Sequence, residues 1–379
     1  MQTQISQLKN GEWIQFDTQE LSPNLVQLVL VFGERFLLED SLVYAGIKEK
    51  YPNATVVTGS TSGEICNTGV FDDTVVTVAM YFEKTSLSFS KANINSFSST
   101  YDLGKFVANA LPKENLKYVL VISDGGKVNG TELTAAINEV VGDQVLVTGG
   151  LAGDKARFEK TIVGLNEDIA EGNVVLVGMY GEHIKVGCGL RGGWDMFGPE
   201  RVITKASQNV LFEIDHVNAL ELYKKYLGKY AADLPGSALL FPLAIKSNNE
   251  ENQLVRTILS IDEEKQSMTF AGNMPEGARV RLMKANFDKL IFSAGEAATD
   301  AENVLGTAHA DFVLLISCVG RKLVLGSRTE EEVEAAAEVF GAATKIAGFY
   351  SYGEISPQQF GTCSDLHNQT MTITTFTEL

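Results

Sequence analysis

The chain has 379 residues, of which 45% are hydrophobic, and a formal net charge of −17. Because nucleic acid and anionic membranes both attract positive surfaces, this charge argues against either as a partner. The length predicts two domains, and no apolar run approaches the roughly 20 residues that a membrane-spanning helix needs.

The beginning of the chain predicts a cytoplasmic protein. The segment 1–21 is polar and carries Asp17 and Glu20, whereas a signal peptide has a basic segment followed by an apolar one. The cysteines lie far apart and form no Cys-x-x-Cys pair, which predicts reduced thiols and neither a zinc site nor a disulfide framework. They are Cys66, Cys188, Cys318 and Cys363.

A unit of about 40 residues occurs three times, and such internal repetition determines the architecture. Each unit predicts a strand, a helix, a second strand, a glycine-rich loop and a further strand. The first strands are expected at 26–32, 119–123 and 312–317, and the last at 75–81, 174–180 and 370–374. The repeated order predicts an α/β protein in which mixed sheets carry helices on their faces.

The helices of the three units are predicted to be amphipathic, so that each covers one face of a sheet. The first is expected over 35–50, with Leu38, Leu42 and Ile47 toward the core. In the third unit, Thr329 and Glu332 have the spacing of a capping box at a helix start.

Between the second and third units the pattern changes to short strands. A strand is expected at 203–211, a helix at 215–227 ended by Gly228, and a turn at 234–236. A meander of short strands follows at 239–245, 255–261, 268–270 and 279–283. We therefore expect two interlocked domains, 1–228 and 229–379, whose boundary is soft if strands pair across it.

Each unit closes on a glycine followed by an acidic residue, in turns that span 59–64, 150–154 and 348–354. The acids are Glu64, Asp154 and Glu354. A carboxylate at such a position can accept N–H groups of its own turn, which is a structural role, or it can hold a ligand ammonium in a crevice shared by the units. The sequence leaves both interpretations open.

Two glycine-rich turns also suggest enzymes or nucleotide binding. The run 149–153 follows a strand, but it leads to another strand instead of a helix whose N-terminus could hold phosphate. The run 59–63 resembles a nucleophile elbow with Thr61 at its centre, but no helix is expected behind it. Hydrolase activity is therefore a weak alternative, and nucleotide binding is disfavoured.

The last unit holds the strongest candidates for ligand contacts. Arg321 follows the strand 312–317 and can pair with a ligand carboxylate, or with Glu330 or Glu331. His367, beside Asn368, can be a satisfied loop histidine, a ligand contact or an axial haem ligand. The flat side chains of Phe349, Tyr350 and Tyr352 suit a planar ligand as well as packing.

These motifs resemble the FIST family over nearly the whole chain. The runs 147–154, 198–204, 219–228 and 241–243 are similar to a FIST N-terminal domain that continues into its partner. Further segments are similar to the FIST C-terminal domain. They are 256–258, 272–277, Ser317, Cys318, Arg321, 348–355, His367, Asn368 and Thr370.

The resemblance implies a sensory module that binds a small ligand such as an amino acid. Some family members of similar length are haem proteins that sense nitric oxide and regulate a histidine kinase. This chain leaves no room for a fused output domain, so its output is expected to pass to a separate signalling protein. The resemblance assigns no haem ligand, and His367 as a ligand is our inference from the sequence.

The sequence thus predicts a cytoplasmic, non-catalytic sensor, with haem-based sensing as the alternative. The ligand is expected to contact Arg321 through a carboxylate and Glu354 through an ammonium, with Tyr350 and Tyr352 around its side chain. Replacing Arg321 by Ala is then expected to abolish binding and leave the melting temperature nearly unchanged, whereas a large loss of stability would indicate a structural role. Glu64, Asp154, His367 and Asn368 complete the expected ligand site.

Overall fold

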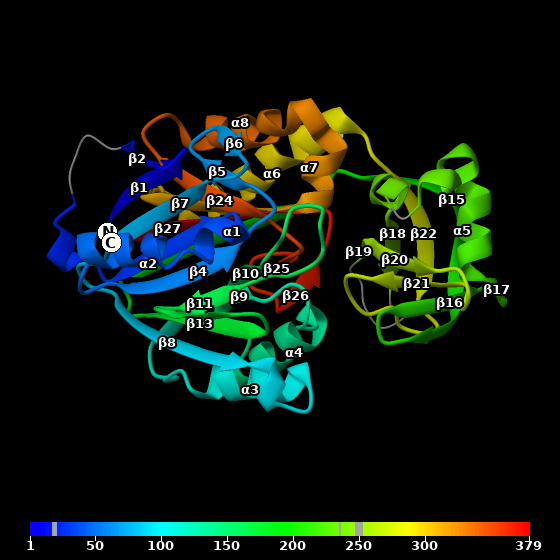
Figure 1. Cartoon of the computed structure of the whole chain (residues 1–379), viewed down its shortest axis with the longest axis horizontal. Coiled ribbons are helices and arrows are strands. Elements are labelled where there is room, and N and C mark those ends of the chain that lie inside the picture. Colours follow the sequence, from blue (N-terminus) through cyan, green and yellow to red (C-terminus); the bar gives the residue numbers. More distant parts are fainter. Residues whose placement is uncertain (17–20, 235, 247–252) are drawn as a thin grey trace.

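The structure, a computed structural model, describes residues 1–16, 21–234, 236–246 and 253–379 (Figure 1). Asp17, Glu20, part of the turn expected at 234–236 and the turn before 255 lie outside the described residues. A large body made of the three units is joined to a smaller domain formed by residues 195–284, which we call the small domain. The α/β class with mixed sheets and helices on their faces is confirmed.

Each unit contains two parallel strands, and an antiparallel strand lies beside the first of them. Unit 1 comprises β3 (Leu28–Gly33), α1 (Arg35–Leu38), α2 (Ser41–Lys50), β4 (Thr55–Ser60) and β7 (Val75–Tyr81). Unit 2 comprises β9 (Leu116–Ser123), α4 (Gly130–Val141), β10 (Leu146–Leu151) and β13 (Asn173–Tyr180). Unit 3 comprises β23 (Phe312–Cys318), α7 (Val319–Leu325), α8 (Thr329–Phe340), β24 (Lys345–Ser351) and β27 (Met371–Glu378).

The loop of each unit carries a hairpin that leaves its own sheet and joins the sheet of another unit. The hairpins are β5 (Glu64–Cys66) with β6 (Gly69–Phe71), β11 (Val163–Leu165) with β12 (Asp168–Ala170), and β25 (Gly353–Pro357) with β26 (Ser364–His367). They pair with β24, β4 and β10 respectively. Unit 1 thus contributes its hairpin to the sheet of unit 3, unit 2 to the sheet of unit 1, and unit 3 to the sheet of unit 2. The units are therefore interlocked in a cycle, in three sheets that the sequence did not reveal.

Further strands and helices complete the body. The strands are β1 (Gln2–Lys9), β2 (Glu12–Gln15), β8 (Ser86–Asn93) and β14 (Ile184–Arg191), and the helices are α3 (Thr100–Asn109) and α6 (Phe287–Leu305), with short 3₁₀ turns at Pro23–Leu25, Ile94–Ser96 and Gly326–Arg328. The two ends of the chain lie together, because the amino group of Met1 is 3.3 Å from the carboxylate of Glu378 (Figure 1).

The three sheets share one apolar core along their inner faces. Phe32 of unit 1 stacks on Phe349 of unit 3 with ring centroids 4.6 Å apart, and Tyr118 of unit 2 lies edge-on to Phe376 at 5.3 Å. Helices cover the outer faces, so the central strands are buried on both sides and consist of nearly continuous apolar runs.

Three local predictions about the helices need correction. The helix expected over 35–50 is broken, because Asp40 caps α2 by accepting the N–H of Leu42. Leu42, expected in the core, is 74% exposed, since the new helix start turns it outward. The capping box at Thr329 and Glu332 is wrong, because the start of α8 has no side-chain cap.

The small domain is an antiparallel sheet packed against one helix. Its strands are β15 (Asp195–Ser207), β16 (Val210–Ile214), β17 (Val217–Asn218), β18 (Leu243–Lys246), β19 (Leu254–Arg256), β20 (Ile258–Asp262), β21 (Ser267–Phe270) and β22 (Arg279–Lys284). Its helix is α5 (Ala219–Leu227), capped by Gly228, with 3₁₀ turns at Gly228–Asp233 and Gly236–Leu240. The single strand expected at 203–211 is a hairpin, which turns at Gln208 with φ of 51°.

Strands pair across the boundary expected at 228/229, since β15 pairs with β22 and β16 with β21. The position 228/229 therefore lies within the small domain. The small domain touches the body through Arg256, whose Nη1 donates to the carbonyl of Leu366 at 2.9 Å, and through the amides of Asn129 and Asn273 at 3.1 Å.

Candidate functional site

The three Gly-acid turns meet where the units exchange their hairpins. The N–H of Ser62 donates to the carbonyl of Tyr350 at 2.8 Å, and the N–H of Gly153 donates to Ser60 at the same distance. The N–H of Tyr352 donates to Leu151 at 3.1 Å. Each turn therefore bonds to the next in a closed cycle, and all three lie at the carboxyl ends of parallel strands.

Glycine is needed within this exchange for close packing of neighbouring strands. A Cβ on Gly348 would lie 1.8 Å from the carbonyl oxygen of Leu315, and a Cβ on Gly149 would lie 2.0 Å from that of Val121. Both contacts are with backbone of the parallel partner strand, which cannot move aside. The glycines of these runs therefore serve strand packing rather than phosphate binding.

Glu64 and Glu354 are fully buried and occupy corresponding places at the start of two exchanged hairpins. The carboxylate of Glu64 accepts hydrogen bonds from the hydroxyls of Thr61 at 2.5 Å and Thr74 at 2.7 Å. The carboxylate of Glu354 accepts from the hydroxyls of Ser351 at 2.6 Å and Thr370 at 2.8 Å. Because burial disfavours the charged form, it raises the pKa of Glu64 to about 7 and that of Glu354 to about 8, although these hydrogen bonds oppose the shift.

These contacts determine what the first turn can do chemically. The hydroxyl of Thr61 is buried and donates to a carboxylate on its own turn, so it faces no histidine that could activate it. The nucleophile-elbow interpretation of 59–63 therefore has no support from the geometry.

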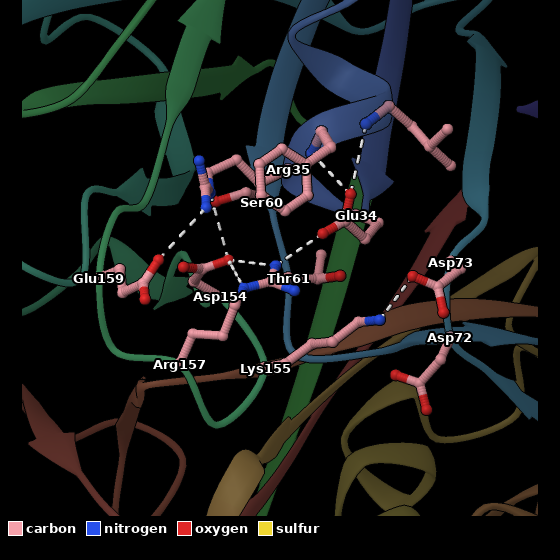
Figure 2. Close-up of polar contacts among 12 residues, drawn as sticks. Glu34, Arg35, Ser60, Thr61, Asp72, Asp73, Asp154, Lys155, Arg157 and Glu159 are labelled. Atoms are coloured by element: carbon pink, nitrogen blue, oxygen red, sulfur yellow. Dashed lines mark hydrogen bonds and ion pairs between the residues drawn. The ribbon is translucent and has the colours of Figure 1, made fainter.

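Asp154 has a different environment from the other two acids. Glu64 and Glu354 lie within the strands β5 and β25, whereas a loop runs from Asp154 to Ile162 before β11 begins. Figure 2 shows its carboxylate between the guanidinium groups of Arg35 and Arg157, with Glu34 on the far side of Arg157. Burial alone would raise the pKa of Asp154, but hydrogen bonds from Arg157, the Lys160 N–H and Arg35 outweigh it, and the pKa lies below its usual range. Asp154 is thus ionised and paired.

Lysines complete the charged surface around this cluster. The Nζ of Lys155 lies 2.6 Å from the carboxylate of Asp73, as Figure 2 shows, and Lys322 lies 2.6 Å from Asp72. The same Lys322 ammonium donates to the carbonyl of Ser62 at 2.9 Å and so ties unit 3 to the first turn.

Arg321 is fully buried, and its guanidinium donates hydrogen bonds to other groups of the protein. Its Nη2 is 2.7 Å from the carboxylate of Glu332, and Nη1 and Nη2 donate to the carbonyls of Gly192 and Leu290. The ion-pair partner is therefore Glu332, where the sequence suggested Glu330 or Glu331. Tyr350 is also buried and donates to Glu332 at 2.8 Å, so both residues face the protein interior.

His367 is a buried, satisfied histidine on β26. Its Nε2 lies 2.9 Å from the carbonyl of Ser356, which can only accept, so Nε2 carries the proton. Burial, aided by the charge of Arg256, lowers the pKa of His367 to about 4, and the ring is neutral. Asn368 is buried beside it and donates to the carbonyl of Tyr352 at 3.4 Å.

Haem does not fit this arrangement. Only 2% of His367 is exposed, and its strand is paired with β25 in the register Glu354 to His367. An iron atom could reach the ring only if this pairing and the Ser356 hydrogen bond were broken. The three other histidines, His183, His216 and His309, are exposed on the surface, whereas haem is held in an enclosing apolar pocket.

Tyr352 is the predicted site residue that lines a cleft. The cleft has a volume of about 660 Å³ and lies between the body and the small domain. Its body wall includes Gly125, Leu151, Phe158, Thr161 and Tyr352, and its small-domain wall includes Asn209, Leu259, Ser260, Thr269 and Phe270. A volume in this range is typical of small-molecule sites.

The body wall of the cleft lies at the carboxyl ends of β9 and β10, at the point where the chain crosses to another sheet. In open α/β sheets, ligands usually bind outside the carboxyl ends of the strands. Lys127 and Glu171 lie on its rim 3.2 Å apart, and Lys160 lies nearby. A second hollow of about 660 Å³ adjoins the first and shares these three residues, but the aromatic wall belongs to the first.

The sequence analysis missed Phe158, Thr161 and the whole small-domain wall. Nothing in the local pattern around Phe158 places it opposite strands of the small domain. The signal that was available is the length of the second loop, which is longer than the first between its acid and its hairpin.

Two kinds of feature were sought among the described residues, a cluster of metal ligands and a membrane-spanning helix. Within residues 1–16, 21–234, 236–246 and 253–379, no three His, Cys, Asp or Glu side chains gather in a way that could hold a metal ion. Within the same ranges, no helix is both long and apolar enough to cross a membrane. No disulfide joins any of the four cysteines, all of which lie in described residues, and all but Cys363 are buried.

Comparison with known protein families matches most of the chain. A family model described as the FIST N domain matches residues 27–217, and one described as the FIST C domain matches residues 219–357. A search of curated proteins found no match.

Proposed function

Because the chain belongs to the FIST family, whose domains are sensory modules of signal transduction, we propose that it binds a small, amino-acid-like ligand and reports this binding to a separate signalling protein. The protein would act in the cytoplasm, without catalysis, on a partner such as a histidine kinase. The cleft between the body and the small domain is the ligand site in this proposal.

The position of the cleft carries the proposal. It lies where the second and third turns cross between sheets, and its other wall belongs to the small domain, which bonds to the body at Arg256 and Asn273. A ligand that contacts both walls changes how firmly the two parts are held together. Binding can therefore alter the surface that a partner recognises.

The chemistry of the rim suits a ligand with both charges. The rim carries two half-exposed ion pairs, Lys127 with Glu171 and Lys160 with Glu39, which offer cations for a carboxylate and anions for an ammonium. These residues take the roles that the sequence analysis gave to Arg321 and Glu354, whose side chains are engaged inside the protein.

The other predicted site residues support the cleft from behind in this proposal. The crossing turns are held by Glu64, Glu354, Tyr350 and Asn368. Of the predicted residues, Tyr352 is the one that lines the cleft. Asp154, paired with Arg35 and Arg157, fixes the start of the loop that carries Phe158.

A variant that fills the cleft tests the proposal. Ser260 lies on the small-domain wall and is exposed, so Ser260→Trp should occupy the cleft without disturbing the body. Glu264→Trp, in the exposed turn after β20, is the matched control. We expect members of an L-amino-acid panel to raise the melting temperature of the parent and of Glu264→Trp, but not of Ser260→Trp. An equal rise in all three proteins would remove the cleft from consideration.

A further inference from the structure

One aromatic side chain on the cleft wall has an unusual backbone. Phe158 has φ of 53°, a left-handed conformation that non-glycine residues with bulky side chains rarely adopt. Its side chain is 43% exposed, although large aromatic side chains are normally well buried. Both properties cost free energy, so the surrounding structure must hold the residue in place.

The surrounding contacts hold Phe158 against Tyr352. The two rings are stacked, with centroids 4.7 Å apart and an angle of 23° between their planes. The N–H of Phe158 donates to the hydroxyl of Tyr352 at 3.2 Å, and that hydroxyl donates to the carbonyl of Lys155 at 3.2 Å. Tyr352 is only 8% exposed and therefore forms a fixed base for the exposed ring.

The stack forms one wall of the cleft and faces strands of the small domain. Phe158 and Tyr352 both line the cleft, and the half-buried Leu259 lines it from β20, whereas the Phe270 side chain is buried in the core of the small domain. A flat group that enters between these walls has an aromatic plate on one side and Leu259 on the other. Aromatic rings prefer such stacked neighbours over aliphatic groups of the same size.

We propose that the ligand of this cleft carries an aromatic ring, which stacks on Phe158, and that Phe158 is the residue that selects it. This inference rests on the proposed function, because it concerns the same cleft. With the charged rim of Lys127, Glu171 and Lys160, the ligand class is an aromatic α-amino acid or a closely similar zwitterion.

Binding of individual amino acids to purified full-length protein tests this inference by calorimetry. The probes are L-phenylalanine and L-tryptophan, with L-leucine as the non-aromatic reference. Phe158→Leu removes the ring but keeps an apolar side chain, and Phe106→Leu, at an exposed phenylalanine of α3, is its control. We expect Phe158→Leu to weaken binding of the two aromatic ligands about three- to tenfold and to leave L-leucine nearly unchanged.

A second variant separates ligand selection from a purely structural role. Asn tolerates the left-handed conformation, so Phe158→Asn relieves the backbone while removing the ring. We expect it to lose the preference for aromatic ligands with no fall in melting temperature. A fall in melting temperature with unchanged ligand preference would mean that the ring only covers Tyr352, and the inference would be wrong.

The outcomes distinguish this inference from the proposed function. If L-leucine or other aliphatic amino acids bind, are blocked by Ser260→Trp and are preferred over aromatic ones, the cleft remains the site and the aromatic inference fails. If no amino acid binds, or if binding survives Ser260→Trp, the proposed site fails and the aromatic inference falls with it.

Discussion

The first and third turns differ from the second, although all three end in a glycine followed by an acid. In the first and third, Glu64 and Glu354 are fully buried, and hydroxyl and backbone groups of the strands around them hold their carboxylates. In the second, two arginines hold Asp154, and a loop with exposed side chains follows it to the cleft.

The same local motif therefore serves two purposes, and the difference lies in what surrounds it. The first and third turns, which we call the closed turns, hold the hairpins of units 1 and 3 in the sheets of the neighbouring units. The second turn, which we call the open turn, is followed by a loop of several residues before β11 starts. That loop forms part of one wall of the cleft. Closed turns should thus respond to mutation through stability, and the open turn through ligand binding as well.

The largest effect is expected at Arg321, behind the third turn. Arg321→Ala leaves the carboxylate of Glu332 buried without its cation, so we expect a loss of about 3–5 kcal/mol in the free energy of unfolding, measured by urea denaturation. Arg328→Ala, which removes an exposed ion pair with Asp288 and Glu331, should cost about 1 kcal/mol or less.

The double variant Arg321→Met/Glu332→Leu sharpens this test. It removes both charges, so no buried ion is left unpaired, but the Tyr350 hydroxyl and the carbonyls of Gly192 and Leu290 lose their partners. We therefore expect it to recover only part of the lost stability. If Arg321→Ala kept its full stability and lost only ligand binding, Arg321 would belong to the ligand site, and the comparison between closed and open turns would fail.

The next effect is a pH dependence that should belong to the closed turns. The pKa of Glu354 is raised from 4.5 to about 8 in the folded protein, so the folded state holds a proton that the unfolded state has lost between these values. Stability should therefore fall as the pH rises from 4.5 to 8, by several kcal/mol if Glu354 acts alone. The sign is opposite to that of an ordinary paired carboxylate.

Glu354→Gln should remove this contribution, because an amide keeps the shape and carries no charge. We expect the variant to become more stable relative to the parent as the pH rises, in urea melts at pH 5, 7 and 9. Glu334→Gln, at an exposed position of α8, should follow the parent at every pH. Parallel curves for parent and Glu354→Gln would show that Glu354 is ionised throughout.

The strands and helices were predictable because their patterns are local. The strand expected at 75–81 is β7 with the same bounds, and the apolar runs at 119–123 and 312–317 lie inside β9 and β23. The exchange of hairpins was not predictable, since the partner of a three-residue strand such as β5 is more than two hundred residues away. No local pattern records which sheet a short hairpin joins.

The site was predictable to the extent that it follows the repeats. The repeated glycine and acid led to Glu64, Asp154 and Glu354, which the structure brings to neighbouring turns. The pattern did not distinguish Arg321, whose guanidinium is satisfied by Glu332 on the next helix, from an arginine open to a ligand. It also missed Phe158, whose importance depends on Tyr352 and on a domain wall formed by distant residues.

The smallest effect is expected at the open turn itself. Asp154→Asn removes the charge between Arg35 and Arg157, but Glu34, Glu39 and Glu159 remain near these arginines, so we expect a loss of about 2 kcal/mol in the free energy of unfolding at pH 7. Asp73→Asn, which unpairs the exposed end of Lys155, should cost less than about 0.5 kcal/mol.

The pH dependence of the Asp154 variant completes the contrast with Glu354. The pKa of Asp154 is lowered, so its contribution is present above the pKa of the unfolded chain and is lost as the pH falls through the lower value of the folded state. The difference between parent and Asp154→Asn should therefore shrink in acid, whereas the difference for Glu354→Gln grows in base. Because Asp154 also fixes the start of the loop that carries Phe158, Asp154→Asn should weaken binding of L-phenylalanine as well. If both variants showed the same dependence on pH, the two kinds of turn would be physically equivalent, and the open turn would have no separate role.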